Sequence, residues 1–280
     1  MTTNRYYSVF DMFSIGLGPS SSHTVGPMRA AAEFARSLRD APVTRIRCSL
    51  HGSLADTGKG HGTDRAILLG LSGEHPETVD VDKVSSRIAD IRESGEIRLA
   101  DGRCISFKEP QDLIFTRGKP LPRHPNGMHF SAMDAKGNTI AEEVIYSVGG
   151  GFIVCEQDWE RRSSNGNPAV PYPFQNGEEL LERCGESGLS IADLVLANEV
   201  SIHPEERVAA RLDEIWRAME ECMHRGMTAT GTLPGGLNVA RRAKSCHEAL
   251  VAREQRSAED PLTILDWVNL YALAVNEENA

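Results

Sequence analysis

This 280-residue sequence contains fewer basic than acidic residues. It holds 30 Lys and Arg against 40 Asp and Glu, a formal net charge of −10. Nucleic-acid binding needs a basic face, so this balance argues against a nucleic-acid partner. The sequence also lacks an apolar run of bilayer-spanning length, and it does not open with a charged and then apolar secretion signal. We therefore expect a cytoplasmic protein that has neither nucleic acid nor a membrane as a partner.

Closely spaced cysteines are also missing. No two of the six have the spacing of a zinc ribbon or a ferredoxin, and without a secretion signal we expect no disulfides. Most of them are expected to act as small buried hydrophobic residues. The six are Cys48, Cys104, Cys155, Cys184, Cys222 and Cys246.

Hydrophobic residues make up 40% of the chain, enough for a core in one large or two ordinary domains. Up to residue 155, helical patterns mix with alternating strand patterns such as Ile46–Leu50, and Asp101-Gly102 is a hairpin signal. This predicts an α+β fold with an N-terminal mixed α/β sandwich domain over residues 1–155. Residues 156–176 form a linker rich in small and turn-forming residues.

From residue 177 to 280 only helical patterns follow, with Asn176 and Ser190 as expected N-caps, which predicts an all-α domain. A long helix begins after Pro204 and is expected to end at Gly226, and further helices are expected at about 237–256 and 261–278. The last of these is apolar nearly all round, as helices buried in large domains are. We therefore expect residues 177–280 to be the incomplete beginning of a longer helical domain, with a dimer-interface helix as the alternative.

The polar cluster within Gly16–Pro27 lies where a loop becomes a helix. Free N–H groups, the positive helix end and hydroxyl side chains together can seat a carboxylate or phosphate. A single serine would suffice as an N-cap, so the surplus favours anion binding over capping alone. The cluster consists of Ser20, Ser21, Ser22, His23 and Thr24.

A second glycine-rich segment, His51–Asp64, joins a strand to a helix and superficially suggests a phosphate loop. Five residues, however, separate Gly52 from Gly58-Lys59, and Gly60 stands where a magnesium-binding Ser or Thr would be needed. Nucleotide binding is therefore disfavoured.

We expect this flexible segment to bring His51, Lys59 and His61 to a ligand instead. His61 immediately precedes a helix, whose positive end disfavours an imidazolium and so favours a neutral general base. A purely structural loop histidine is an equal alternative.

The run from His124 to Gly127 is the third polar cluster. His124 and Asn126 could orient a substrate or gate its entry, although the same four residues also make an ordinary turn. A zinc site built from the histidines of the three clusters has no supporting ligand spacing.

Taken together, several motifs resemble the iron–sulfur L-serine dehydratases of bacteria, in the right order over nearly the whole chain. In the first domain these are Phe10–Thr24, His51–Leu54, Gly58–Asp64, His124–Met128 and Ser147–Phe152. In the second, Gly231–Leu237 and Asp266–Ala280 resemble the start of the family's helical catalytic domain. Both domains in one polypeptide match the single-chain type.

The resemblance implies an L-serine ammonia-lyase, which converts L-serine to pyruvate and ammonia with a 4Fe-4S cluster and without pyridoxal phosphate. One iron of the cluster, lacking a cysteine ligand, would act as a Lewis acid on the substrate hydroxyl. The family's cluster cysteines lie in the C-terminal part of the helical domain, and none of the six cysteines here matches them. We therefore assign no metal ligand, and we expect this chain to be inactive alone and the complete enzyme to be a homodimer.

The resemblance also implies roles for the three polar clusters. The residues from Ser20 to Thr24 would hold the substrate carboxylate or line the site. His61 would take the α-proton, with Lys59 nearby, and His124 and Asn126 would bind or gate. The alternative is that the first domain is a regulatory serine-binding module, and a third reading, an interaction protein without chemistry, is disfavoured by the clustering of histidines in glycine-rich loops.

Overall fold

The computed structural model describes residues 6–18, 20–162, 168–233, 238–254 and 262–279. Two compact units emerge, and each draws on distant parts of the sequence. The first comprises Met1–Ser14 and Trp159–Ala218, and the second comprises Ile15–Asp158 and Met219–Ala280. Within the described residues, no helix is both long enough and apolar enough to cross a bilayer.

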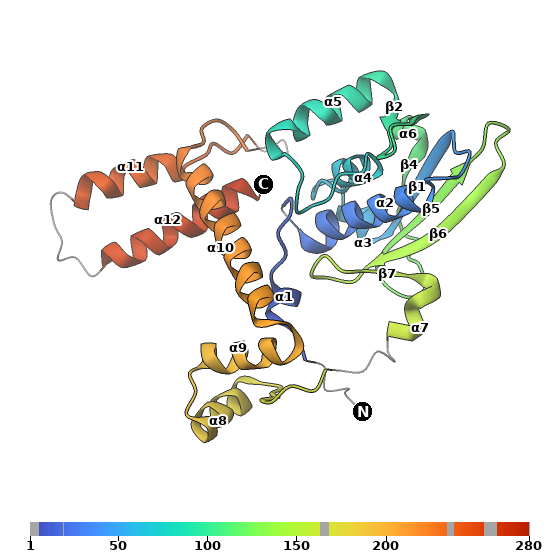
Figure 1. Cartoon of the computed structure of the whole chain (residues 1–280). Helices are drawn as coiled ribbons and strands as arrows, with labels where there is room; N and C mark the ends of the chain where they lie inside the picture. The colour runs from blue at the N-terminus through green and yellow to red at the C-terminus, as the bar shows by residue number, and fades with distance from the viewer. Residues whose placement is uncertain (1–5, 19, 163–167, 234–237, 255–261, 280) are drawn as a thin grey trace. The chain divides into compact units, whose positions relative to one another are not determined.

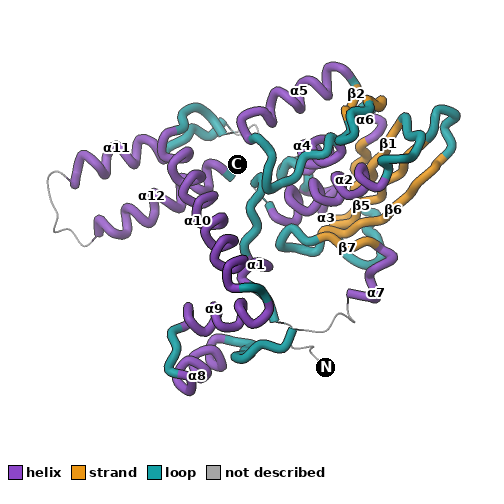
Figure 2. The backbone as a smooth tube through the Cα atoms, viewed as in Figure 1, coloured by secondary structure: helices purple, strands orange, loops and turns teal. Residues whose placement is uncertain are grey.

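A mixed sheet forms the centre of the second unit (Figures 1 and 2). The strand order is β2-β3-β1-β5-β6-β7, and β4 pairs with β1. Strand β1 runs parallel to β4 and antiparallel to β5, so that Cys48 lies opposite Phe130. The strands are β1 (Arg45–Gly52), β2 (Glu96–Arg98), β3 (Cys104–Ser106), β4 (Leu113–Thr116), β5 (Asn126–Met133), β6 (Thr139–Ser147) and β7 (Ile153–Cys155).

Helices cover one face of this sheet, which confirms the predicted α+β class. Strand β1 alternates buried and partly exposed residues, as its sequence pattern predicts. Its buried side chains meet those of α2 and α4 in one core, where Phe34 stacks on Phe130 with ring centroids 5.1 Å apart. The helices of this region are α2 (Gly26–Ser37), α3 (Ser53–Thr57), α4 (Thr63–Leu71), α5 (Val84–Ser94) and α6 (Glu109–Asp112), with the 3₁₀ turn η2 (Val81–Lys83) before α5.

The first unit is helical, and a buried carboxylate fastens its N-terminal segment. Glu199, 1% exposed, accepts hydrogen bonds from the Tyr6 hydroxyl (2.8 Å), the Ser8 hydroxyl (2.7 Å) and the Val9 amide (2.8 Å). Burial and Glu199 raise the pKa of Tyr6 well above its ordinary value. The elements are α1 (Val9–Met12), α7 (Trp159–Arg162), α8 (Gly177–Ser187), α9 (Ile191–Ile202) and the first part of α10 (Glu205–Thr228), while the 3₁₀ turn η3 (Glu156–Asp158) ends the preceding stretch of the second unit.

Two helix starts in this unit confirm their sequence signals. The Asn176 side chain accepts from the Glu179 amide at 2.9 Å, and Ser190 accepts from the Asp193 amide at 3.2 Å. Both are N-cap bonds that satisfy otherwise unpaired helical donors.

Helices α11 (Ala243–Glu254) and α12 (Leu262–Glu278) belong to the second unit, and they correct two expectations. Gly226 does not end α10, which continues to Thr228. A side chain at Gly226 would collide with the carbonyl of Ala274, so this glycine allows α10 and α12 to approach closely. The motif Gly231–Leu237 falls partly outside the described residues.

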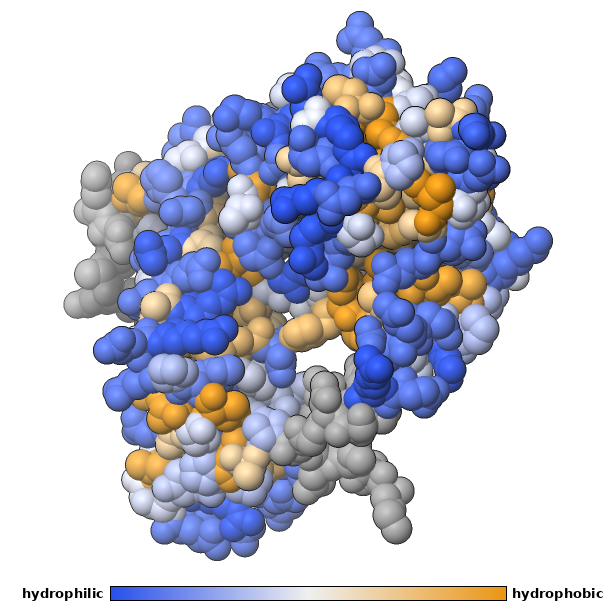
Figure 3. Space-filling view, turned by 45° about the vertical axis from the view of Figure 1, so that its right-hand side comes forward, coloured by the Kyte–Doolittle hydropathy of each residue, from blue (hydrophilic) through white to orange (hydrophobic). Residues whose placement is uncertain are grey.

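Although α12 is apolar nearly all round, several of its apolar side chains are exposed. Leu270 and Ala274 are buried against α11, whereas Ile264 is 72% exposed and Val268 is 57% exposed. The reason is that α11 covers only one side of the helix. Apolar surface also interrupts the hydrophilic surface elsewhere, as Figure 3 shows in its lower part.

The cysteines also differ from expectation. Only Cys48 is buried, Cys104 and Cys246 are exposed, and the others are intermediate. The expectation that most cysteines are buried is therefore wrong, because the spacing of cysteines in the sequence does not indicate how deeply each side chain is buried.

Candidate functional site

The serine cluster begins with an unusual turn. Residues Ser21–Val25 form the π-helical turn η1, which runs directly into α2. The Ser20 hydroxyl accepts from the His23 amide at 3.2 Å, and the Ser20 carbonyl accepts from the Thr24 amide at 2.9 Å. Wide turns of this kind often occur at functional sites. Here the turn directs the side chain of His23 toward Ser53 and His61.

The imidazole of His23 is held at both ring nitrogens. Its Nδ1 lies 2.9 Å from the Ser22 hydroxyl, and its Nε2 lies 3.0 Å from the Ser53 hydroxyl. Ser53 is the first residue of α3, in the second glycine-rich segment. His23 thus links the serine cluster to the segment that carries His61.

His61 lies against His23, as the sequence motifs alone could not show. The two ring centroids are 5.0 Å apart, with an interplanar angle of 65°, an edge-to-face arrangement. Burial lowers the pKa of His23, and the nearby His61 lowers it further, while a hydrogen bond to the backbone of Ser53 opposes the shift. His23 is therefore a histidine that favours its neutral form.

Two threonines fix the backbones that carry these histidines. The Thr24 hydroxyl donates to the carbonyl of His61 at 2.8 Å, and the Thr63 hydroxyl donates to the carbonyl of His23 at 2.5 Å. Both side chains are buried, at 3% and 0% exposure. Each threonine therefore binds the backbone near the other one, and two hydrogen bonds link the segment of His23 to the segment of His61.

The third polar cluster packs onto the same region. The Ser53 amide donates to the carbonyl of Pro125 at 2.8 Å. Gly52 has φ of +54°, and any side chain there would collide with that carbonyl. The Asn126 amide donates to His124 Nδ1 at 3.2 Å, which fixes the imidazole of His124 within its own turn.

Ser147, at the end of β6, joins the third cluster to the first. Its hydroxyl donates to the carbonyl of Ser22 at 2.8 Å, and its own carbonyl accepts from the Asn126 side-chain amide at 3.2 Å. Ser147 is fully buried, and only a glycine at position 26 leaves room for it. Four stretches far apart in the sequence therefore meet in one polar network.

The remaining predicted residues lie at the margin of this network. Ser21 is exposed, and among the described residues its hydroxyl has no hydrogen-bond partner. Lys59 is also exposed, without an ion pair in the part of the chain that the structure describes. His51 Nδ1 instead lies 2.9 Å from the carbonyl of Lys119.

Three residues of the network are absent from the set expected from sequence: Ser53, Thr63 and Ser147. Each occurs within a segment with glycine or polar neighbours, but a single serine or threonine in such a segment is no signal by itself. Their importance depends on contacts across 21 to 125 positions of sequence, which no local pattern encodes.

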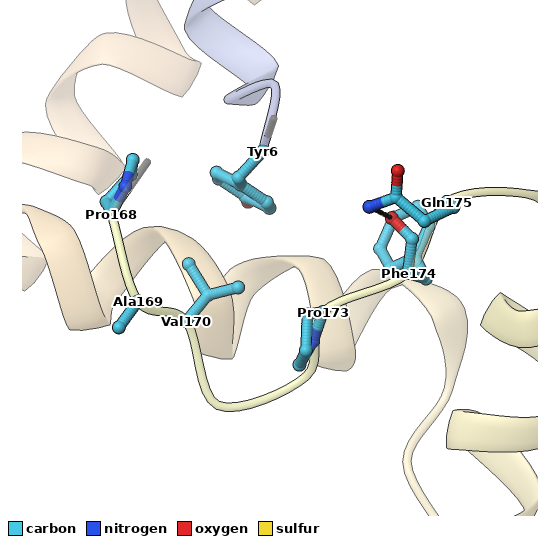
Figure 4. Close-up of a pocket in the computed structure, with 7 residues that line it drawn as sticks. All are labelled: Tyr6, Pro168, Ala169, Val170, Pro173, Phe174 and Gln175. Atoms are coloured by element: carbon cyan, nitrogen blue, oxygen red, sulfur yellow. Dashed lines mark hydrogen bonds between the residues drawn. The ribbon is translucent and has the colours of Figure 1, made fainter. Parts of the chain in front are cut away.

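Two hollows elsewhere in the chain contain none of these residues. In the first unit, Tyr6 faces the segment from Pro168 to Gln175 across a pocket of about 260 Å³ (Figure 4). In the second, a pocket of about 250 Å³ lies between α11 and α12. The polar network, with its paired imidazoles, is the better candidate because neither hollow combines a histidine with converging hydroxyl groups.

The described residues do not fit an iron–sulfur cluster or another metal centre. No three metal-ligating side chains converge within the described ranges. Clusters are held by thiolates, yet burial raises the pKa of the Cys48 thiol, and burial followed by Glu143 raises that of Cys155 to about 12. Both effects disfavour the form that binds iron.

Comparison with known proteins places the two parts of the chain in related families. Residues 8–158 match the family model for the serine dehydratase beta chain, and residues 186–280 match that for the serine dehydratase alpha chain.

Curated relatives extend the match over nearly the whole chain. An L-serine dehydratase of Streptomyces coelicolor is 49% identical over 279 residues, and L-serine dehydratase 1 of Escherichia coli is 43% identical over 278. Each alignment covers 98% of this chain and 60% of the relative. The L-serine dehydratase of Mycobacterium tuberculosis is 45% identical, with 59% of its length covered. Because the beta-chain model alone matches more than half of the sequence, the chain belongs to the serine dehydratase family.

Proposed function

We propose that this chain serves in the conversion of L-serine to pyruvate and ammonia, with His61 as the base that takes the α-proton. The observation that carries the proposal is the edge-to-face pair of His23 and His61, whose backbones are held by the hydroxyls of Thr24 in η1 and Thr63 at the start of α4. The relatives named L-serine dehydratase support serine as the substrate class.

The reaction requires a proton and a leaving group on adjacent carbons. His61 would take the proton from Cα, the electron pair of that bond would form the Cα–Cβ double bond, and the Cβ–O bond would break. The departing hydroxide takes up one proton and leaves as water, and this proton balances the one that His61 takes from Cα and later releases. The remaining 2-aminoacrylate tautomerises to the imine, which takes up water to release ammonia and pyruvate. A positioned neutral imidazole is suited to the first step near neutral pH.

The serine cluster would bind the carboxylate of the substrate. Ser21 is exposed with an unused hydroxyl, at the N-terminal end of η1, where helical N–H groups point outward. Ser20, Ser22 and His23 would line the same side of the site. Thr24 would contribute by holding the backbone of His61, since its own hydroxyl is already donated there. His124 and Asn126 would shape or gate the entry from the neighbouring turn, and Lys59 would lie close to the base.

The iron–sulfur cluster implied by the resemblance finds no fit in the described cysteines. No step of this proposal is therefore assigned to such a group. The roles above concern binding, orientation and proton transfer by residues of this chain.

Replacing the base tests the proposal directly. In an active enzyme that contains these 280 residues, purified without oxygen, we expect His61→Ala to lower the rate of pyruvate formation by about 10²- to 10⁴-fold. His75→Ala is the matched control, because His75 is an exposed histidine of the same unit outside the network. A His61→Ala enzyme that retains turnover within a few-fold of the wild type would show that another group is the base.

The regulatory alternative predicts a different pattern. If the first domain only binds serine as an effector, Ser21→Ala and Asn126→Ala will change the cooperativity of the serine response and leave the limiting rate intact. If these residues belong to the active site, the same variants will alter KM or kcat without changing the shape of the curve.

A further inference from the structure

Ser53 occupies a position that connects all three polar clusters. Its hydroxyl meets Nε2 of His23, and its amide donates to the carbonyl of Pro125. It lies directly after Gly52, whose left-handed backbone lets β1 turn sharply into α3. The placement of this one hydroxyl is therefore set by the strand, the turn and the neighbouring loop together.

The hydrogen bonds of His23 leave its ring little freedom. A neutral imidazole has one N–H donor and one acceptor nitrogen, and a hydroxyl can act in either sense. With Ser22 at Nδ1 and Ser53 at Nε2, both nitrogens are satisfied and rotation of the ring would break both bonds. The edge-to-face contact with His61 depends on that fixed orientation.

Ser22 cannot fix the ring by itself. It is adjacent to His23 in sequence and belongs to the same turn, so its bond moves with η1. Ser53 is the partner from another element, and its backbone is anchored independently at Pro125. The orientation of His23 relative to His61 therefore depends on Ser53.

We propose that Ser53 is a positioning residue: it fixes His23 against His61 and so holds the base in its reactive orientation. This inference rests on the function proposed above, because it assigns to Ser53 an effect on His61. Ser53 acts through His23 and does not itself touch the substrate.

The test compares three variants of an active enzyme that contains these 280 residues. Ser53→Ala should lower kcat roughly 10- to 100-fold while KM stays within about twofold, because orientation of the base matters chiefly in the transition state. Ser53→Thr keeps the hydroxyl and should recover most of the loss. Ser86→Ala, which removes a hydroxyl from exposed α5 of the same unit, should change neither constant.

A second measurement reads the ring directly in this 280-residue chain. Nuclear magnetic resonance of the His23 ring should indicate one fixed ring orientation in the wild type and in Ser53→Thr, and averaging between ring orientations in Ser53→Ala. A Ser53→Ala protein with a fixed His23 ring orientation and wild-type kcat overturns the inference. Loss of activity in Ser53→Ala that Ser53→Thr does not recover also counts against it.

Failure of the inference can be told apart from failure of the proposed function. If His61→Ala abolishes turnover and Ser53→Ala does not change it, His61 is the base and Ser53 is not its positioning residue. If His61→Ala retains turnover, the proposed function is wrong whatever Ser53 does to the ring of His23.

Discussion

At the scale of single residues, the network uses side-chain hydroxyls to fix histidines. Thr24 and Thr63 donate to the carbonyls of His61 and His23, and the hydroxyls of Ser22 and Ser53 meet the His23 ring. Each bond of this kind contributes about 1 kcal/mol to stability, yet an unpaired buried partner costs more. Such a network therefore favours one arrangement strongly over its alternatives.

The lowered pKa of His23 makes the stability of the fold depend on pH. The folded state disfavours the imidazolium of His23, whereas the unfolded chain binds the proton at the ordinary pKa of 6.5. The contribution is thus fully present above that pH and is lost as the pH falls from it toward the lower folded-state pKa. We expect the free energy of unfolding to fall as the pH is lowered through the ordinary histidine pKa of 6.5 toward the lower folded-state pKa, and to fall less in His23→Gln.

Urea unfolding of the chain at several pH values checks this prediction. His75→Gln serves as the control, since His75 is exposed and lies outside the network. Equal pH dependence in the wild type and in His23→Gln would mean that the protonation of His23 does not contribute to the pH dependence of the free energy of unfolding.

The sequence indicated individual residues of the polar network better than their pairing. Hydroxyl and histidine clusters next to glycine were visible in the order of residues, and the structure brings His23, His61 and Asn126 into one network. The contact between His23 and His61 spans 38 positions and depends on how α2 and α4 pack, which local patterns do not encode. Ser53 and Ser147 were missed for the same reason.

At the scale of elements, local chemistry predicted most of the secondary structure. Alternation in β1, the hairpin at Asp101-Gly102 and the caps at Asn176 and Ser190 depend only on near neighbours, and all are observed. Gly226 was misread because a glycine at a helix end and a glycine at a helix crossing look the same in sequence. The exposure of α12 was equally invisible, since periodicity does not say how many neighbours a helix has.

A side chain near the C-terminal end of α12 caps the start of α11. Glu277, 2% exposed in α12, accepts from the Arg242 amide at 2.7 Å and from the Ala243 amide at 3.3 Å. A carboxylate at a helix N-terminus satisfies free donors and interacts favourably with the helix dipole. Helix α11 therefore depends on α12 for its first turn.

Removing this carboxylate should loosen α11. We expect Glu277→Ala to destabilise the chain by about 1 to 2 kcal/mol and to speed hydrogen exchange at the amides of Arg242 and Ala243. Glu277→Gln retains an acceptor oxygen and should have a smaller effect. Glu248→Ala, a change at an exposed glutamate of α11, is the control. Unchanged exchange at the two amides in Glu277→Ala would contradict the capping role.

At the scale of the whole molecule, the chain pairs a sandwich that carries the polar network with helices that carry much apolar surface. It spans about 60% of the length of the curated relatives that it matches. The match to two family models explains why one sequence shows both a mixed sheet and an all-helical part. The network of hydroxyls and histidines lies entirely within the part that matches the beta-chain model.

The distribution of cysteines yields a prediction for the molecule as a whole. An iron–sulfur cluster needs several thiolates within reach of one centre, and no such group exists among the described residues. Burial and nearby carboxylates also keep the thiols of Cys155 and Cys222 protonated. We therefore expect anaerobic incubation of this chain with ferrous iron and sulfide, followed by desalting, to leave no stable visible absorption and no pyruvate formation from serine. A full-length relative treated in parallel is the positive control, and a stable cluster spectrum on this chain would show that its cysteines converge in a way the present fold does not contain.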